Sequence, residues 1–279
     1  AAKLSSMSSQ RAVNKAGIGK ERIGCVVTAS GTGYLCPGLS SYIIEKTGLR
    51  PDVSVFDLQG MGCGAALPAL SAGAGYLASS RDNSCALITC TEICSAAVYW
   101  DSDPGLILSN SIFADGSASV VLSPDQDAAG LDIIDYCVIN LPQAREALRF
   151  KIDKGKLRNV LSKEVPQIVS KAVKAVVGAL LEKNSLRKEE VKYWAIHSGG
   201  SKVLSSVANE LKLSEDDVKA SRETLRDYGN MSSPSVLFTL EKILDSAALQ
   251  NGDHVIMLAF GAGFSCYGML LRANNRRVN

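Results

Sequence analysis

The chain has only two histidines, His197 and His254, and no cysteine pair in C-x-x-C spacing. Structural zinc sites are normally built from such paired ligands, so we expect no metal site, even at Cys90 and Cys94. The sequence also lacks an excess of one charge, because 30 lysines and arginines face 28 aspartates and glutamates. No global field would hold a nucleic acid or a membrane surface, and we expect neither partner.

Long apolar runs are missing as well. No uninterrupted segment is long enough to cross a bilayer, and the N-terminus shows no basic-then-apolar leader, so we expect a cytoplasmic protein. Apolar residues are nevertheless abundant, at 46% of the 279 residues. The chain can therefore bury a sizeable core, as one large domain or as two similar halves.

The eight cysteines do not indicate a disulfide framework. Four of them lie inside apolar, strand-like runs, where a free thiol behaves as a small hydrophobic side chain: Cys85, Cys90, Cys137 and Cys266. We expect these four in the core.

Short β-branched runs alternate with segments of helical period, which favours an α/β protein layered around largely buried strands. The expected strands are 23–29, 53–58, 85–91, 118–122, 131–139, 191–197, 254–260 and 264–271. A helix-like segment over 1–16 opens the chain. The clearest helix is expected over 162–182, with Pro166 in its first turn, where proline is tolerated.

A polar, turn-forming break over 123–127 divides the chain near its middle. The element order on its two sides is similar, which indicates an ancient duplication, and we expect halves at 1–124 and 125–279. In the second half, a helix is expected over 233–247. The first half has no opening strand, so we expect a fragment of a longer polypeptide whose first sheet lacks its central strand and exposes two strand edges.

Cys63 is the first candidate for chemistry. It follows the strand-like run 53–58 and a Gln-Gly-Met-Gly turn, and an Ala-rich helical stretch begins there. The partial positive charge at a helix N-terminus lowers a cysteine pKa from its usual value of about 8.5, which favours a nucleophilic thiolate. Taken alone, however, a glycine-flanked cysteine is more often structural.

Three further segments carry chemically useful groups. His197 ends a strand and precedes Ser-Gly-Gly, a geometry that exposes the imidazole. Asn230 lies on a turn before a helix, where its amide can donate to a developing negative charge. Residues 260–264, Phe-Gly-Ala-Gly-Phe, offer backbone N–H groups to an oxyanion. Each has an ordinary alternative: a histidine satisfied by a carbonyl, a turn or N-cap asparagine, and a hairpin.

Together, these segments resemble the condensing enzymes of the thiolase superfamily, and specifically the type III polyketide synthase family of chalcone and stilbene synthase-like enzymes. The sharpest matches are Gln-Gly-Met-Gly-Cys at 59–63, His-Ser-Gly-Gly at 197–200 and Gly-Asn-Met-Ser-Ser-Pro-Ser-Val-Leu-Phe at 229–238. The resemblance extends from the first helix to about residue 271. It implies two thiolase-like βαβαβαββ halves in an αβαβα layering, with the first strand and helix of the N-terminal half missing.

The resemblance also implies roles for single residues. Cys63 would be the acylated nucleophile, His197 and Asn230 would complete the triad, and Phe113 resembles a gatekeeping phenylalanine at the cavity mouth. The implied reaction is decarboxylative Claisen condensation of a starter acyl-CoA with malonyl-CoA, in a homodimer and without a metal or redox cofactor. The N–H groups of Cys63 and of the loop Gly261, Ala262 and Gly263 would hold the oxyanion.

Several positions depart from the plant members. The 260–264 loop lacks their usual proline and is closer to ketoacyl synthase III, a relative that depends on acyl carrier protein. Cys94 and Ala97 fall where plant enzymes often have threonines, and Cys36 falls where a residue reaches the partner subunit's cavity. Lys202 would replace only in part the basic residues that meet the CoA phosphates.

Residues 155–160 are similar to bacterial members, and a flavonoid product is not supported. Two other functions stay open. One is a ketoacyl synthase III-like enzyme that makes a single extension with malonyl carrier protein. The other is a non-catalytic partner subunit that uses the thiolase fold for dimerisation, although the presence of all three triad residue types speaks against it.

Overall fold

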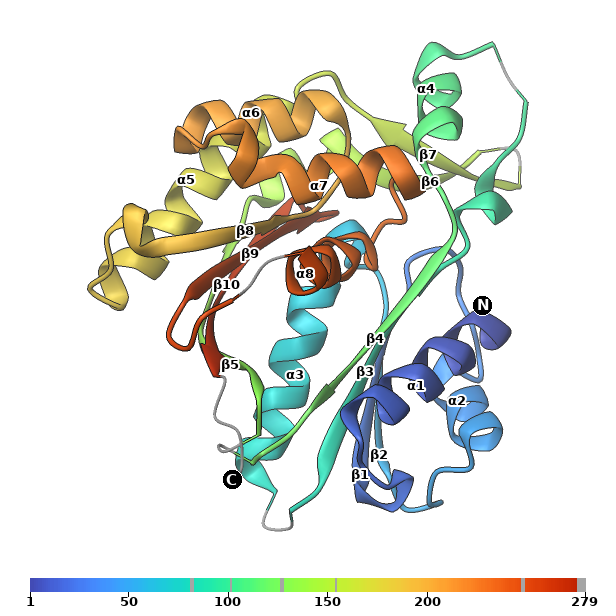
Figure 1. Cartoon of the computed structure of the whole chain (residues 1–279). Coiled ribbons are helices and arrows are strands. Elements are labelled where there is room, and N and C mark those ends of the chain that lie inside the picture. The colour runs from blue at the N-terminus through green and yellow to red at the C-terminus, as the bar shows by residue number, and fades with distance from the viewer. Residues whose placement is uncertain (81–82, 101, 126–127, 154, 247–248, 275–279) are drawn as a thin grey trace.

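The computed structural model of the chain describes residues 1–80, 83–100, 102–125, 128–153, 155–246 and 249–274. Two four-stranded mixed sheets dominate it, and helices cover both faces of each sheet (Figure 1). Within these ranges, no helix combines the length and the apolar character that a bilayer span requires.

The first sheet has the strand order β2-β1-β3-β4. Its members are β1 (Ile23–Ala29), β2 (Ser54–Leu58), β3 (Cys85–Glu92) and β4 (Gly116–Leu122). β1 runs parallel to both β2 and β3, while β4 is antiparallel to β3. The two exposed strand edges expected at the centre of this sheet are not seen, because β1 pairs directly with β3 from Ile23 to Ala29. That the sequence lacks the first strand of this half stays a prediction.

The second sheet has the order β5-β10-β9-β8. It consists of β5 (Gly130–Asn140), β8 (Val191–Ile196), β9 (His254–Gly261) and β10 (Ser265–Asn274). β8 is parallel to β9, and β10 is antiparallel to both of its neighbours. All eight strands overlap the expected ranges and differ from them by at most three residues at an end, because continuous apolar runs mark buried strands clearly.

The helices form three layers around the two sheets. α1 (Ala2–Ala16) and α2 (Leu39–Thr47) cover the outer face of the first sheet, and α5 (Val165–Lys183) and α6 (Ser201–Leu211) cover that of the second. Between the sheets lie α3 (Ala66–Ser79) and α8 (Ser235–Ser246), and α7 (Glu215–Tyr228) packs on α8 and β8. α8 is the helix expected over 233–247, whose last residue lies outside the described ones, and Pro166 lies in the first turn of α5 as expected.

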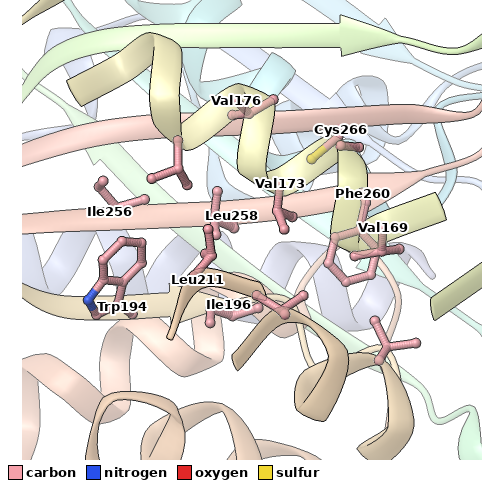
Figure 2. Packing of buried hydrophobic residues seen from close by; sticks show 14 of the residues in the cluster. Val169, Val173, Val176, Trp194, Ile196, Leu211, Ile256, Leu258, Phe260 and Cys266 are labelled. Atoms are coloured by element: carbon pink, nitrogen blue, oxygen red, sulfur yellow. The ribbon is translucent and has the colours of Figure 1, made fainter. Parts of the chain in front are cut away.

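The core is divided among the layers. One apolar cluster joins α5 and α6 to the second sheet, and Figure 2 shows Val173 and Val169 of α5 beside Leu258 and Phe260 of β9. A second cluster fills the central layer, and a third lies under α1 and α2. All eight cysteines are free thiols. Cys85, Cys90 and Cys266 are fully buried, whereas Cys137 is half-buried against the first cluster.

An antiparallel hairpin was not anticipated from the sequence. β6 (Leu148–Asp153) and β7 (Lys156–Leu161) lie beside α4 (Pro104–Ile112), and the guanidinium of Arg158 is 2.8 Å from the carboxylate of Asp103. The hairpin covers the region of Phe113, next to the end of β3. The division of the chain at residue 124 stays a prediction.

Candidate active site

The three predicted triad residues occupy the ends of regular elements. Cys63 lies on the short 3₁₀ turn Gly62–Gly64, between β2 and α3. His197 directly follows β8, and Asn230 lies between α7 and α8. All three side chains are buried. Turns after two strands and between two helices thus carry three polar groups into the interior.

Contacts join these residues around one small volume. The hydroxyl of Ser232 hydrogen-bonds Cys63, and the N–H of Ser232 donates to Oδ1 of Asn230 over 2.8 Å. Nδ2 of Asn230 donates to the carbonyl oxygen of Gly199 over 3.3 Å. A Cβ atom added to Gly199 would lie 3.2 Å from Nε2 of His197. The structure therefore brings the three residues together.

The end of β9 and the glycine turn that follows it pack against the backbone around Cys63. Phe260 packs edge-on against His197, with 5.2 Å between ring centroids. A Cβ atom on Gly261 would lie 2.5 Å from the carbonyl oxygen of Met61 and 3.1 Å from the N–H nitrogen of Cys63. Only glycine allows this close approach. Beyond it, Ala262 is half-buried and packs against Gly62, and Gly263 is exposed.

Burial dominates the protonation of the site. It raises the pKa of Cys63 to about 12 and lowers the pKa of His197 to about 3. A hydrogen bond from Ser232 lowers the Cys63 pKa, but by less than burial raises it. The expected depression of the Cys63 pKa is therefore wrong for the unliganded site, because loss of water outweighs the helix N-terminus. Both groups are neutral at pH 7.

The imidazole of His197 lacks the hydrogen bond that normally fixes a structural histidine. Within the described part of the chain, its buried Nδ1 atom has no hydrogen-bond partner. A histidine with a purely structural role normally fixes its tautomer through a carbonyl or carboxylate. An unpartnered ring nitrogen suits a group that exchanges a proton with a ligand.

Hydrogen bonds hold both the side-chain amide and the backbone of Asn230. Ser232, which has a left-handed φ of 61°, turns its N–H toward Oδ1 of Asn230 and leaves the NH₂ group on the side of His197. The backbone of Asn230 pairs with the segment that carries Phe113, through a 2.8 Å bond to Ile112 and a 2.9 Å bond from Ala114. Phe113 is thereby held beside the triad.

Glu92 was not singled out from the sequence, although it is the one charged residue of the buried strand β3. Its side chain has no exposed surface, and its carboxyl group accepts hydrogen bonds from Gly31 N–H at 2.9 Å and from Ser233 at 2.7 Å. Burial raises its pKa, and its negative charge raises the pKa of Cys63. The buried carboxyl group of Glu92 therefore lies close to the nucleophile candidate, Cys63.

Of the predicted pocket residues, Phe113, Cys94 and Ala97 come together. They border a small cavity of about 20 Å³ that the hairpin closes with Phe150 and Asn159. The wall is fixed by a 2.7 Å hydrogen bond from Asn159 to the hydroxyl of Ser109.

Two other predicted residues lie elsewhere. Cys36 is exposed on the loop before α2, and Lys202 is exposed in the first turn of α6. Neither borders the cavity beside Phe113.

A larger hollow of about 880 Å³ borders the last turns of α3 and the first residues of β5. Cys63 precedes the opposite end of this 14-residue helix, about 20 Å away at 1.5 Å per residue. None of the predicted site residues lines the hollow. It therefore plays no part in the site around Cys63.

Comparison with known families covers most of the chain. The sequence model described as "Chalcone and stilbene synthases, C-terminal domain" matches residues 136–275, and that described as "FAE1/Type III polyketide synthase-like protein" matches residues 6–197.

Among curated relatives, the 3,5-dihydroxyphenylacetyl-CoA synthase of Amycolatopsis balhimycina is 36% identical over 242 residues, which cover 86% of this chain and 64% of the relative. The alpha-pyrone synthesis polyketide synthase-like Pks18 of Mycobacterium tuberculosis is 30% identical over 257 residues, covering 89% of this chain and 64% of Pks18. The chain thus spans less than two thirds of the length of these relatives.

Solved structures share the fold. PKS-I from the brown alga Ectocarpus siliculosus superposes with a TM-score of 0.91 at 30% identity, over 98% of this chain and 74% of that one. The 1,3,6,8-tetrahydroxynaphthalene synthase of Streptomyces coelicolor A3(2), described as a bacterial type III polyketide synthase, gives a TM-score of 0.89 at 23% identity, over 96% of this chain and 76% of that one. The fold is therefore the mixed α/β, thiolase-like fold of these enzymes.

Proposed function

This chain belongs to the type III polyketide synthase family, and from that premise we propose that it catalyses decarboxylative Claisen condensation of a starter acyl-CoA with malonyl-CoA to give a polyketide. The observation that carries the proposal is the series of contacts from Cys63 through Ser232 and Asn230 to Gly199, which lies beside the imidazole of His197. A thiol, an imidazole and an amide donor along these contacts support the proposal.

Acyl loading is the first step. His197 takes the proton of Cys63, the thiolate attacks the acyl thioester, and the proton passes to the departing CoA sulfur, so the acyl group becomes a thioester of Cys63. Because burial disfavours either ion alone, the thiolate and the imidazolium form together as a pair. The N–H groups of Cys63 and of Ala262 support the oxyanion that forms at the acyl carbonyl.

Condensation follows in the same volume. Malonyl-CoA loses carbon dioxide, and its electron pair forms an enolate whose oxygen accepts hydrogen bonds from His197 and from Nδ2 of Asn230. The enolate carbon attacks the acyl carbonyl, the bond to Cys63 breaks, and the thiolate is regenerated beside a β-ketoacyl-CoA. Phe113, Cys94 and Ala97 would line the path of the acyl chain, and the cavity of about 20 Å³ that they border would have to widen to admit it.

A homodimer and a duplicated origin of the two halves are parts of the same proposal. β2 is an edge strand of the first sheet, with Val55 and Phe56 each more than two fifths exposed, and Tyr34 on the neighbouring loop is 83% exposed. Apolar side chains along an unpaired strand edge favour pairing with a second copy. Cys36, on the same loop, would then reach toward the partner.

The test is transfer of a labelled acyl group from acyl-CoA to the chain, followed by release of carbon dioxide from malonyl-CoA. We expect Cys63→Ala to abolish loading and Cys137→Ala, which removes a half-buried thiol of the second sheet, to retain it. If the folded chain never becomes acylated at Cys63, the proposal fails and the role of a non-catalytic partner subunit gains.

The same assay separates the two extender substrates. The wild-type chain is offered malonyl-CoA and malonyl carrier protein in parallel. We expect malonyl-CoA to be used, with Lys202 near its phosphates. Exclusive use of the carrier protein would instead assign a single, ketoacyl synthase III-like extension.

A further inference from the structure

Glu92 is a buried acid that the mechanism above does not use. The residues described provide it with no lysine, arginine or histidine as an ion-pair partner, and its hydrogen bonds come from a backbone N–H and hydroxyl groups. A carboxyl group without surface exposure costs folding free energy, so its presence at the end of β3 calls for an explanation. Its neighbours supply one.

Two segments of the site converge on the Glu92 carboxyl group. One oxygen accepts from Gly31 N–H at 2.9 Å, and the hydroxyl of Thr32, which itself accepts from Ile93 N–H at 2.9 Å, also bonds the carboxyl group. The other oxygen accepts from Ser233 at 2.7 Å and from Ser232 at 3.4 Å. Glu92 thus ties the loop after β1 to the turn that carries Asn230.

Ser232 makes contacts in three directions. Its N–H fixes Oδ1 of Asn230, while its hydroxyl lies within reach of both Glu92 and the sulfur of Cys63. A serine hydroxyl has one proton, so it can donate to only one acceptor at a time. When it donates to Glu92, Cys63 lacks that donor, and when Cys63 is a thiolate, the sulfur is the competing acceptor.

We propose that Glu92 is a positioning residue of the condensing site, which competes with Cys63 for the hydroxyl of Ser232 and so governs when the thiol becomes nucleophilic. The proposal rests on the assignment of Cys63 as the acylated nucleophile. Acylation of Cys63 removes the thiolate, and the Ser232 hydroxyl then returns to Glu92, which holds the Asn230 turn during decarboxylation.

Among the residues that the structure describes, three titratable groups approach Cys63, and Glu92 is the carboxyl group among them. Glu92 approaches it from β3, Cys94 from the turn after β3, and His197 from the end of β8. Asp115 acts on Cys94 and is not among the groups that shift the pKa of Cys63. Removing the charge of Glu92 therefore removes the like charge nearest to a forming thiolate.

The test is the rate at which iodoacetamide alkylates Cys63 between pH 7 and pH 11, followed on the peptide that contains Cys63. E92Q removes the negative charge and weakens the competing acceptor, and we expect the rate at a given pH to rise about tenfold. S232G keeps the left-handed backbone but removes the hydroxyl donor, and we expect the rate to fall about tenfold.

Opposite directions distinguish the proposal from general loosening, which would raise both rates. D57N is the matched control, because Asp57 is also a carboxylate of the first sheet that binds hydroxyl groups, those of Thr28 and Ser40, and it does not act on Cys63. Its rate should equal that of the wild type.

An unchanged or lower rate in E92Q, or a shift of both variants in one direction, overturns the proposal. Should E92Q not fold, S232G decides alone, since an unchanged or raised rate there overturns it. The assay needs no acyl-CoA. A chain that loads no acyl group yet shows the opposite shifts refutes the proposed function and keeps the role of Glu92.

Discussion

At the scale of single residues, His197 and Asn230 have separable tasks. In the proposed mechanism, His197 exchanges the proton of Cys63 and also binds the enolate, whereas the Asn230 amide, held by Ser232, only donates to the enolate. Because burial keeps Cys63 and His197 neutral, loading depends on a proton transfer between them. Removing the imidazole should therefore affect both steps, and removing the amide only one.

We expect His197→Ala to lower the rate of acyl loading about 10²–10⁴-fold. Asn230→Ala should load normally but release carbon dioxide from malonyl-CoA about 10²–10³-fold more slowly. Intact-mass measurement follows loading, and labelled malonyl-CoA follows decarboxylation. His254→Gln, which changes the other histidine, is the control and should leave both rates unchanged. Equal loss of loading in the Asn230 variant would contradict the separation of tasks.

Gly261 tests the packing of the loop against Cys63. A methyl group at this position would lie 2.5 Å from the carbonyl oxygen of Met61 and 2.6 Å from the nitrogen of Gly64. We expect Gly261→Ala to lower the free energy of unfolding by about 1–3 kcal/mol, measured by urea unfolding. Gly178, in the exposed face of α5, has open space around it, and Gly178→Ala should raise the same quantity by about 0.5–1 kcal/mol. Equal effects would contradict the steric argument.

Sequence patterns predicted Cys63, His197 and Asn230 because each follows or precedes a regular element at a glycine-rich turn. Glu92 and Ser232 were not predicted, because their roles depend on contacts between residues more than 100 positions apart in the chain. The 2.7 Å hydrogen bond from Ser233 to Glu92 is an example. The pKa of Cys63 was also misjudged. A helix N-terminus can be read from sequence, but the removal of water from a thiol cannot.

At the scale of elements, two side chains of β7, Arg158 and Asn159, link the β6–β7 hairpin to α4. Arg158 bridges Asp153 within the hairpin and Asp103 at the N-cap of α4, at 3.1 and 2.8 Å. Because β6 and β7 pair only with each other among the described strands, this bridge and the bond from Asn159 to Ser109 hold the hairpin over the cavity.

We expect Arg158→Ala to speed amide hydrogen exchange in β6 and β7, because the hairpin loses its link to α4. Mass spectrometry of the corresponding peptides measures this. Arg149→Ala is the matched control, since Arg149 lies in the same hairpin and, among the described residues, forms an ion pair with nearby Glu146 alone, so exchange should stay close to wild type. Equal acceleration in both variants would show that general weakening of the hairpin, not the link to α4, is responsible.

The elements themselves differ in how clearly the sequence marks them. The eight strands of the two sheets are buried apolar runs and lie close to the expected ranges. The hairpin strands alternate apolar and charged residues, as in the Leu-Arg-Phe-Lys-Ile-Asp of β6, and were missed. A two-stranded ribbon on the surface buries little apolar side-chain area, so its sequence lacks the apolar run that marks a buried strand.

At the scale of the whole molecule, the order of strands decides which edges are available. The sequence suggested an open gap at the centre of the first sheet, but β1 and β3 pair directly and the edges are β2 and β4. α1 packs along β4, where Ser8 bonds Ser117 and Ser119 at 2.7 and 2.8 Å. β2 combines an unpaired edge with exposed apolar side chains.

The last prediction concerns self-association of the chain through β2. In a two-fold symmetric pair, the same edge residues of both copies approach each other, so one substitution places two like charges near the axis. We expect the unmodified chain to be a dimer of twice 29.5 kDa, and Phe56→Glu to be a monomer at low salt, because the two carboxylates repel and the apolar contact is lost. Light scattering coupled to size-exclusion chromatography measures the mass.

Ile152→Glu is the matched control for that change. Ile152 is 80% exposed, against 44% for Phe56, but it belongs to the hairpin and not to the edge of a large sheet. The same charge there should leave the dimer intact, and salt should partly restore association of the Phe56 variant by screening. A monomeric unmodified chain, a dimeric Phe56→Glu variant or a monomeric Ile152→Glu variant would each exclude β2 as the specific contact, and Cys36 would then have no partner cavity to reach.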